Sequence, residues 1–156
     1  MTEEAESRRA FEKALRLLSF RDRSRQEMLS GLKDRGFSEP VLSRTIDRLT
    51  ELKYLDDEAF SVRYARHLAV NRLYGDRRIE MALTEKGIER DIVRRGIAQA
   101  RQELAQKDAI SLLLDKKIGG RKKDLDPAEK RRIAQFLLRR GFSSSVVYEV
   151  LREMPS

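Results

Sequence analysis

The chain has 156 residues, and its 34 Lys and Arg against 26 Asp and Glu give a formal net charge of +8, which favours an acidic partner, nucleic acid first. Charged residues make up 38% of the chain and aromatic residues only 6%, which argues against a thick two-sheet or doubly wound core and favours many amphipathic helices. The absence of cysteine excludes disulfides and thiolate chemistry, and the single histidine, His67, cannot form a multi-histidine metal site, so we expect no cofactor, no metal and no enzyme.

Apolar periodicity predicts helices throughout and no strand, so the expected fold class is all-α. With ends placed to within about two to four residues, the predicted helices cover 7–18, 24–35, 39–52, 57–73, 76–86, 89–101, 103–118, 127–140 and 144–153. Ser24 with Glu27 forms a capping-box pattern, and Asp126-Pro127 supplies a cap and a proline at the first helical position. No stretch is long and apolar enough to span a membrane, and no signal peptide is expected, so we place the protein in the cytoplasm.

An anchor of a basic residue, a glycine and a large apolar residue occurs three times along the chain. The copies are Arg35-Gly36-Phe37, Lys86-Gly87-Ile88 and Arg140-Gly141-Phe142, and the flanking apolar positions superpose at helical intervals without a gap. The sequence therefore predicts an elongated tandem array of three three-helix, helix-turn-helix-like repeats. Their ranges are 1–52, including an N-terminal arm, then 53–102 and 103–156.

Each anchor glycine is expected to end a helix in the left-handed conformation, which glycine adopts without steric cost. In a Schellman ending the residue after the glycine packs on a leucine near the end of the helix. This pairing predicts contacts of Phe37 with Leu32, Ile88 with Leu83 and Phe142 with Leu137. Where the middle repeat begins, Leu55 and Phe60 flank Asp56 in the pattern of a hydrophobic staple.

The only tight acidic cluster is Asp56-Asp57-Glu58. Adjacent carboxylates suit acid–base chemistry or a hard cation, but at a helix start they also accept hydrogen bonds from free backbone amides and interact well with the helix dipole. We favour this capping role. His67, which lies one step off an apolar stripe, is interpreted as a packing residue at a helix edge.

Basic clusters supply the candidate residues for binding a partner or DNA. They are Arg77, Arg78, Lys116, Lys117, Arg121, Lys122, Lys123, Arg139 and Arg140. A solvated surface loop is the equal alternative for 116–123. Tyr74, beside Gly75, is expected to be exposed and able to stack on a base, whereas Tyr54, Tyr64 and Tyr148 are expected in cores or joints. Net charge rises from +1 to +3 to +4 across the repeats, which favours the C-terminal half as the binding end.

Two helices joined by a short glycine turn also suggest a helix-turn-helix reader of DNA. The residues that would open each recognition helix are Ser38-Glu39-Pro40, Glu89-Arg90-Asp91 and Ser143-Ser144-Ser145. Because two of the three contain acids that would face phosphate, major-groove readout by all three repeats is disfavoured.

The order and spacing of these features resemble the RecX family, the bacterial regulators of the RecA recombinase. The resemblance covers nearly the whole chain after about residue 10. It rests on Ser24, Glu27 and Leu32; Arg35-Gly36-Phe37; Leu49; Tyr54-Leu55-Asp56-Asp57-Glu58-Ala59-Phe60; Tyr64; Gly75-Asp76-Arg77-Arg78-Ile79; Leu83; Lys86-Gly87-Ile88; Lys116-Lys117; and Phe136-Leu137-Leu138-Arg139-Arg140-Gly141-Phe142. Two places depart from the family: Ser61 stands where alanine is usual, and the arm before Phe11 matches nothing particular.

The resemblance implies a non-enzymatic regulator, expected to be a monomer, that lies in the helical groove of a RecA filament on single-stranded DNA. Binding there would inhibit ATP hydrolysis, strand exchange and the coprotease activity that assists LexA cleavage in the SOS response. The expected partners are RecA and DNA, single-stranded first and double-stranded second, bound without sequence preference. Two alternatives stay open: a helix-turn-helix-like DNA-binding protein acting without RecA, and a helical scaffold for another acidic protein.

Overall fold

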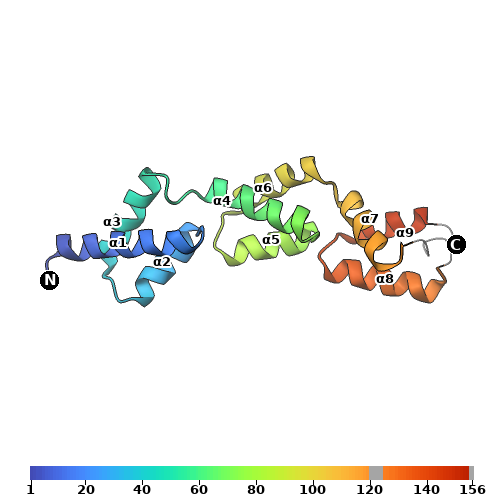
Figure 1. Ribbon diagram of the computed structural model, residues 1–156, viewed down its shortest axis with the longest axis horizontal. Coiled ribbons are helices and arrows are strands. Elements are labelled where there is room, and N and C mark those ends of the chain that lie inside the picture. The colour runs from blue at the N-terminus through green and yellow to red at the C-terminus, as the bar shows by residue number, and fades with distance from the viewer. Residues whose placement is uncertain (120–124, 155–156) are drawn as a thin grey trace.

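The computed structural model of the protein describes residues 1–119 and 125–154. Over these residues the chain forms α-helices and one π-helical segment and no strand, which confirms the all-α prediction (Figure 1). The first repeat holds α1 (Glu3–Phe20), α2 (Arg25–Asp34) and α3 (Glu39–Glu51). The second holds α4 (Asp57–Arg66), η1 (His67–Asn71), α5 (Asp76–Glu85) and α6 (Arg90–Glu103). The third holds α7 (Gln106–Lys117), α8 (Pro127–Arg139) and α9 (Ser144–Glu153).

The helix at 57–73 differs from its predicted form. The α-helix α4 ends at Arg66, and the chain continues through the π-helical turn η1, where the Arg72 N–H bonds to the His67 carbonyl. Leu73 then takes a left-handed φ of 55°. This wider turn directs Leu73 into the core of the third repeat while Tyr74 stays in the core of the second. Periodicity detects the apolar residues here but not the change of helix type.

The first helix also begins earlier than predicted, at Glu3 rather than near residue 7. The Thr2 hydroxyl caps it by accepting a hydrogen bond from the Ala5 amide at 3.1 Å, and three acids lie in its first turn. The N-terminal arm is therefore part of a helix, because a capped and acidic first turn stabilises a helix start even without a large apolar face.

Each repeat surrounds its own apolar core, centred on Met28 and Leu32 in the first, Ile79 and Leu83 in the second, and Leu137 and Phe142 in the third. Leu55, however, packs in the first core and Phe60 in the second, so the hydrophobic staple predicted across Asp56 is wrong. The reason is local. Lys53 adopts a φ of 66°, and the Leu55 amide bonds to the Leu49 carbonyl, which holds Leu55 against the end of α3.

In the second core, α4 and α6 pack closely at Ser61, where the resemblance predicts alanine. Ser61 is fully buried, and its hydroxyl donates to the Ile92 carbonyl at 3.1 Å. A Cβ on Gly96 would lie 2.3 Å from the Ser61 Oγ, so the two helices approach each other through a glycine. The serine hydroxyl is satisfied, and the departure from alanine leaves the core intact.

The three anchor turns have the predicted conformation. Gly36, Gly87 and Gly141 have φ values of 87°, 76° and 96°. Both Schellman bonds are present in the second and third repeats: Ile88 N–H to Leu83 O and Gly87 N–H to Thr84 O in one, and their equivalents from Phe142 and Gly141 in the other. In the first repeat the Gly36 amide bonds to the Lys33 carbonyl at 3.0 Å. The capping box of Ser24 and Glu27 is also complete.

Neighbouring repeats meet through their middle helices, α2, α5 and α8, which lie in a row along one side of the array (Figure 1). The start of one middle helix docks on the glycine turn that ends the next. Between the first two repeats, the Ser24 hydroxyl donates to the Lys86 carbonyl at 2.7 Å. The Arg25 amide donates to Asp57 Oδ1 at 2.9 Å, and Glu27 pairs with the Lys86 ammonium at 3.2 Å.

The second joint repeats this geometry. The Gly75 amide donates to the Arg140 carbonyl at 2.9 Å, and the Arg77 amide donates to the Gly141 carbonyl at 3.0 Å. Beside the joint, within the second repeat, the Arg101 side chain donates to Asp76 Oδ1 at 2.6 Å and to the Tyr74 carbonyl at 2.8 Å. These direct bonds support the expectation of a fixed array rather than domains on flexible linkers, and the molecule is elongated (Figure 1).

Candidate nucleic-acid and partner interface

The acidic cluster at 56–58 has structural roles. Asp56 caps α4 by accepting the Ala59 amide at 3.1 Å, and Asp57 caps α2 of the preceding repeat through the Arg25 amide. Glu58 forms an ion pair with Arg95. The capping interpretation is confirmed for Asp56, and Asp57 extends it across a joint. Within the ranges 1–119 and 125–154 no group of three or more His, Asp or Glu side chains is arranged to hold a metal ion.

The prediction that Tyr74 is exposed is wrong. Only 8% of the residue is accessible, and its ring packs in the second core. The guanidinium groups of Arg78 and Arg140 lie 4.0 Å and 4.7 Å from the ring centroid, and Arg72 donates to the hydroxyl at 2.8 Å. Cation–π contacts from both sides of the joint cover this ring, so Tyr74 joins two repeats and has no free face for a base.

Two of the other three tyrosines also depart from expectation. Tyr54 and Tyr148 are 50% and 48% exposed, although their spacing predicted core or joint positions. Tyr54 meets Phe11 only edge-on, with ring centroids 6.3 Å apart. Tyr64 is half-buried and stacks on Phe60 at 5.6 Å, as expected of a core residue. Helical spacing assigns a face but not whether a neighbouring element covers it, which is why two of these positions were misassigned.

Arg140 is a joint residue as well. Its guanidinium donates to the carbonyls of Leu73 and Arg72, so it closes the turn that delivers Leu73 to the third core. Burial, together with the nearby positive charges of Arg78 and Arg72, lowers the pKa of the Arg140 guanidinium, against an opposing effect of Tyr74. The Arg78 guanidinium also lies at the joint, over the Tyr74 ring, whereas the Arg77 side chain at the start of α5 is exposed and accessible to a partner.

A basic groove of about 670 Å³ lies between the end of α7 and the side of α8 in the third repeat. It brings together two predicted residues, Lys117 and Arg139, with Arg132 and the aromatic ring of Phe136, and Glu129 is the one acidic residue of its lining. The Lys117 ammonium lies 4.3 Å from the Phe136 centroid. Over the described part of the chain, none of these three cations forms an ion pair with a carboxylate. A groove with free cations around an aromatic ring suits a phosphodiester strand carrying bases.

Lys116 is exposed on the last turn of α7, whereas Arg121, Lys122 and Lys123 lie outside the described residues. Phe136 was not among the predicted binding residues, although it belonged to the family motif. Its sequence signal is the spacing of Arg132, Phe136 and Arg139, which puts two cations and a ring on one face of α8. His67 lies against Tyr64 and shares a hydrogen bond with Asn71, as expected at a helix edge.

The helix-turn-helix alternative receives no support at the start of α3. There the Ser38 amide and hydroxyl both bond to the Glu6 carboxylate, at 2.9 Å and 3.2 Å. A carboxylate thus occupies the position where a recognition helix would meet phosphate. None of the helices over the described ranges is long and apolar enough to cross a membrane.

The fold defines a class: all-α proteins built of three docked three-helix repeats. Three family models match consecutive parts of the chain, described as the first, second and third three-helix domains of RecX, over residues 10–49, 56–97 and 103–151. The chain therefore belongs to the RecX family of regulatory proteins.

Two relatives illustrate the range of the family. Regulatory protein RecX of Mycobacterium sp. (strain JLS) is 34% identical over 143 residues, covering 88% of this chain and 76% of the relative. Regulatory protein RecX of Halalkalibacterium halodurans is 29% identical over 152 residues, which is 97% of this chain but only 57% of that longer protein. The crystal structure of RecX from Lactobacillus salivarius has the same fold, with a TM-score of 0.85 at 24% identity over 96% of this chain and 97% of that one.

Proposed function

We propose that this protein regulates the RecA recombinase by lying in the groove of the RecA filament on single-stranded DNA. There it inhibits ATP hydrolysis, strand exchange and the coprotease activity. It acts by binding and not by catalysis, as a monomer in the cytoplasm, where RecA filaments form. The observation that carries the proposal is the rigid head-to-tail docking of three repeats, because it fixes the distance between the two ends of the array and so suggests how binding inhibits the filament.

Rigid docking makes the array a linker of defined span. At about 1.5 Å per helical residue each repeat is roughly 20–25 Å across, so the array reaches on the order of 60 Å. An array of this reach contacts more than one protomer of a filament. Once one end is bound, the other end is held at a high effective concentration near its own site, so the two contacts strengthen each other. Inhibition then follows from holding neighbouring protomers in a fixed relation while ATP hydrolysis requires them to move.

The groove of the third repeat gives this array a contact to DNA. Lys117, Arg132 and Arg139 are positioned to neutralise phosphates, and Phe136 offers a ring to an unstacked base. Binding of this kind has little sequence preference. It weakens with salt, with a log–log slope of about −0.7 per phosphate neutralised on single-stranded DNA and about −0.9 on duplex.

The test is steady-state ATP hydrolysis by RecA on single-stranded DNA, titrated with three forms of the full chain. Alongside the unaltered protein, one variant carries Lys117→Glu and Arg132→Glu at the groove, and a matched control carries Arg90→Glu and Arg94→Glu on the exposed face of α6. We expect the unaltered chain and the control to inhibit, and the groove variant to inhibit at least tenfold less strongly. No inhibition by the unaltered chain contradicts the proposed function, and equal loss in both variants contradicts the role of the groove.

A further inference from the structure

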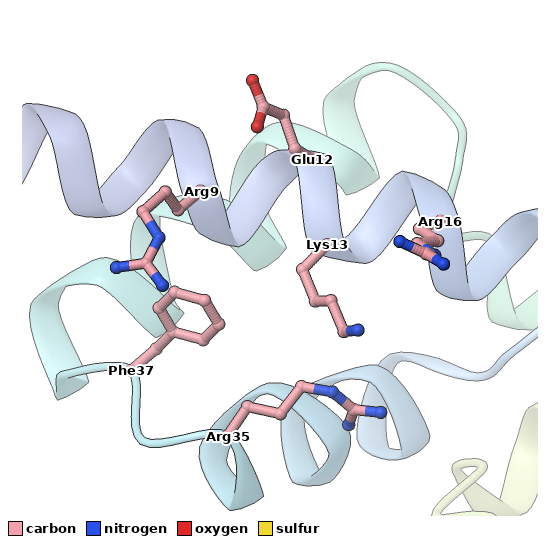
Figure 2. A pocket seen from close by; sticks show the side chains of 6 residues that line it. All are labelled: Arg9, Glu12, Lys13, Arg16, Arg35 and Phe37. Carbon is pink, nitrogen blue, oxygen red and sulfur yellow. The ribbon is translucent and has the colours of Figure 1, made fainter.

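A second basic groove, of about 430 Å³, lies at the opposite end of the array, between α1 and the turn that ends α2. Its lining is Arg9, Glu12, Lys13, Arg16, Arg35 and Phe37. Figure 2 shows the side chains of Arg9 and Lys13 extending from α1 toward Arg35 and the Phe37 ring. The first repeat has the lowest net charge of the three, so its net charge does not reveal that four cations gather at this groove.

Three acids of α1 lie near these cations, and two of them bind partners within the first repeat. Glu3 pairs with Arg44 of α3 at 3.0 Å, and Glu6 accepts the Ser38 amide and hydroxyl. Glu12 also lines the groove, and its carboxylate points away from Arg35 and Phe37 (Figure 2). Two of these carboxylates are therefore satisfied within the fold, and the groove has four lining cations against one lining carboxylate.

The four cations of the groove are available to a ligand. Among the described residues, none of them forms an ion pair with a carboxylate. Arg35 donates to the Gly31 carbonyl at 2.8 Å, which fixes its guanidinium beside the groove and leaves further N–H donors free. Arg9, Lys13 and Arg16 follow one another at intervals of four and three residues, so they form a row about 10 Å long on one face of α1.

The turn at the end of α2 is open where its two counterparts are covered. A Cβ on Gly87 would meet Gln26 at 2.4 Å, and one on Gly141 would meet Arg78 at 2.5 Å, because a preceding repeat docks on each. On Gly36 a Cβ meets no atom within 4 Å in the part of the chain that the structure describes. Phe37 and Arg35 are therefore accessible, whereas the equivalent Ile88 and Phe142 are buried.

We propose that this first-repeat groove binds a single-stranded nucleic acid, with the cations on successive phosphates and the Phe37 ring against a base. A row of cations alone would serve any polyanion, but an accessible aromatic ring among them adds stacking, which a base offers and an acidic peptide does not. The inference deepens the proposed function, on which it rests: together with the groove at α8, it gives the array a nucleic-acid contact near each end. Two separate binding sites on one array raise the apparent affinity for a strand long enough to reach both.

The test uses the full chain and a fluorescent oligothymidylate of about 20 nucleotides, long enough for one or more sites of this kind. The groove variant carries Arg9→Gln, Lys13→Gln and Arg16→Gln. The matched control removes the same charge with Arg8→Gln, Arg90→Gln and Arg94→Gln, all exposed and outside the groove. We expect the groove variant to bind on the order of tenfold more weakly at low salt, with its salt slope reduced by about 2, and the control to change far less.

A second variant, Phe37→Leu, keeps an apolar side chain on the first core and removes the aromatic face. We expect it to lower affinity severalfold while the circular-dichroism melting temperature stays within a few degrees. Equal weakening in the groove and control variants overturns the inference, since it reports only net charge. Displacement of the oligonucleotide by polyglutamate as effectively as by unlabelled oligothymidylate overturns it in favour of an acidic protein ligand. Because this binding needs no RecA, its failure is separate from a failure to inhibit RecA.

Discussion

Gly75 lies where the second and third repeats close on each other, and replacing it with alanine isolates the contribution of that joint. Its φ of −82° is accessible to any residue, so alanine carries no backbone penalty of its own. A Cβ there would lie 2.1 Å from the Phe142 nitrogen and 2.3 Å from the Gly141 carbonyl carbon. Both are backbone atoms of the Schellman turn that ends α8. Since neither can move alone, the two repeats must separate.

The magnitude follows from what separation removes. Two backbone hydrogen bonds are lost, from Gly75 to Arg140 and from Arg77 to Gly141, each contributing about 0.5–1.5 kcal/mol. Leu73 also leaves the third core, which costs about 1.5–3 kcal/mol. Together these give a loss of about 2.5–6 kcal/mol, a large fraction of the about 5–15 kcal/mol that stabilises an ordinary domain.

Gly36→Ala is the matched control. Gly36 has a φ of 87°, so alanine is strained there, yet its Cβ meets no described atom within 4 Å. Left-handed strain costs about 1–2 kcal/mol. The site with the strained backbone is therefore expected to show the smaller effect, which separates joint closure from glycine's conformational freedom.

The assay is urea unfolding followed by circular dichroism, with hydrogen exchange at the Gly75 and Arg77 amides as a direct probe of the joint. We expect Gly75→Ala to lower the free energy of unfolding by more than Gly36→Ala does, and the Arg77 amide to lose protection. Gly75→Ala with a loss of 1 kcal/mol or less and an unchanged Arg77 amide would refute the reasoning that the repeats are rigidly docked.

Three further outcomes follow from the same contacts. Gly87→Val should lower the circular-dichroism melting temperature, because left-handed strain of about 1 kcal/mol or more adds to a clash of its Cβ with Gln26 at 2.4 Å; an unchanged value would contradict the capping assignment. Arg140→Gln should cost about 1.5–3 kcal/mol by urea unfolding, whereas exposed Arg139→Gln stays within about 0.5 kcal/mol, and equal losses would remove Arg140 from the joint. Although burial alone would raise the pKa of Glu27, hydrogen bonds from neighbouring donors lower it overall from 4.5. Glu27→Gln should therefore lower stability at neutral pH, with a difference that shrinks as pH falls below 4.5; a pH-independent difference would show that the carboxylate charge is not involved.

Much of the architecture could be predicted from the sequence because its causes are local. The Arg35-Gly36-Phe37 anchor and its two copies predicted three helix ends, and the capping box at Ser24 predicted a helix start. Such features are decided within one helical turn, by which residue accepts a left-handed φ and which side chain reaches a free amide. Repetition of that local pattern was then sufficient to predict three all-α units.

The π-helical turn and the place of Leu55 were missed for the opposite reason. Both depend on the core in which a leucine at a repeat boundary packs. Leu55 packs in the core of the first repeat and Leu73 in the core of the third. Helical periodicity says that a residue is apolar and buried but not what buries it. The choice is made by packing between segments that are distant in the sequence.

The candidate binding surfaces divide in the same way. The sequence alone determined the surplus of positive charge and the basic pairs at Lys116-Lys117 and Arg139-Arg140. Only the tertiary structure decided that Arg140 and Tyr74 close a joint, that Arg139 lines a groove with Lys117, and that the first repeat carries a groove of its own. A net charge adds acids and bases together wherever they lie, whereas folding pairs Glu3 with Arg44 and Glu6 with Ser38 and places Lys13 at a groove with other cations. Electrostatic attraction falls with distance and is screened over about 10 Å in salt. A ligand at a groove is therefore attracted by the charges close to that groove and not by the net charge of the repeat.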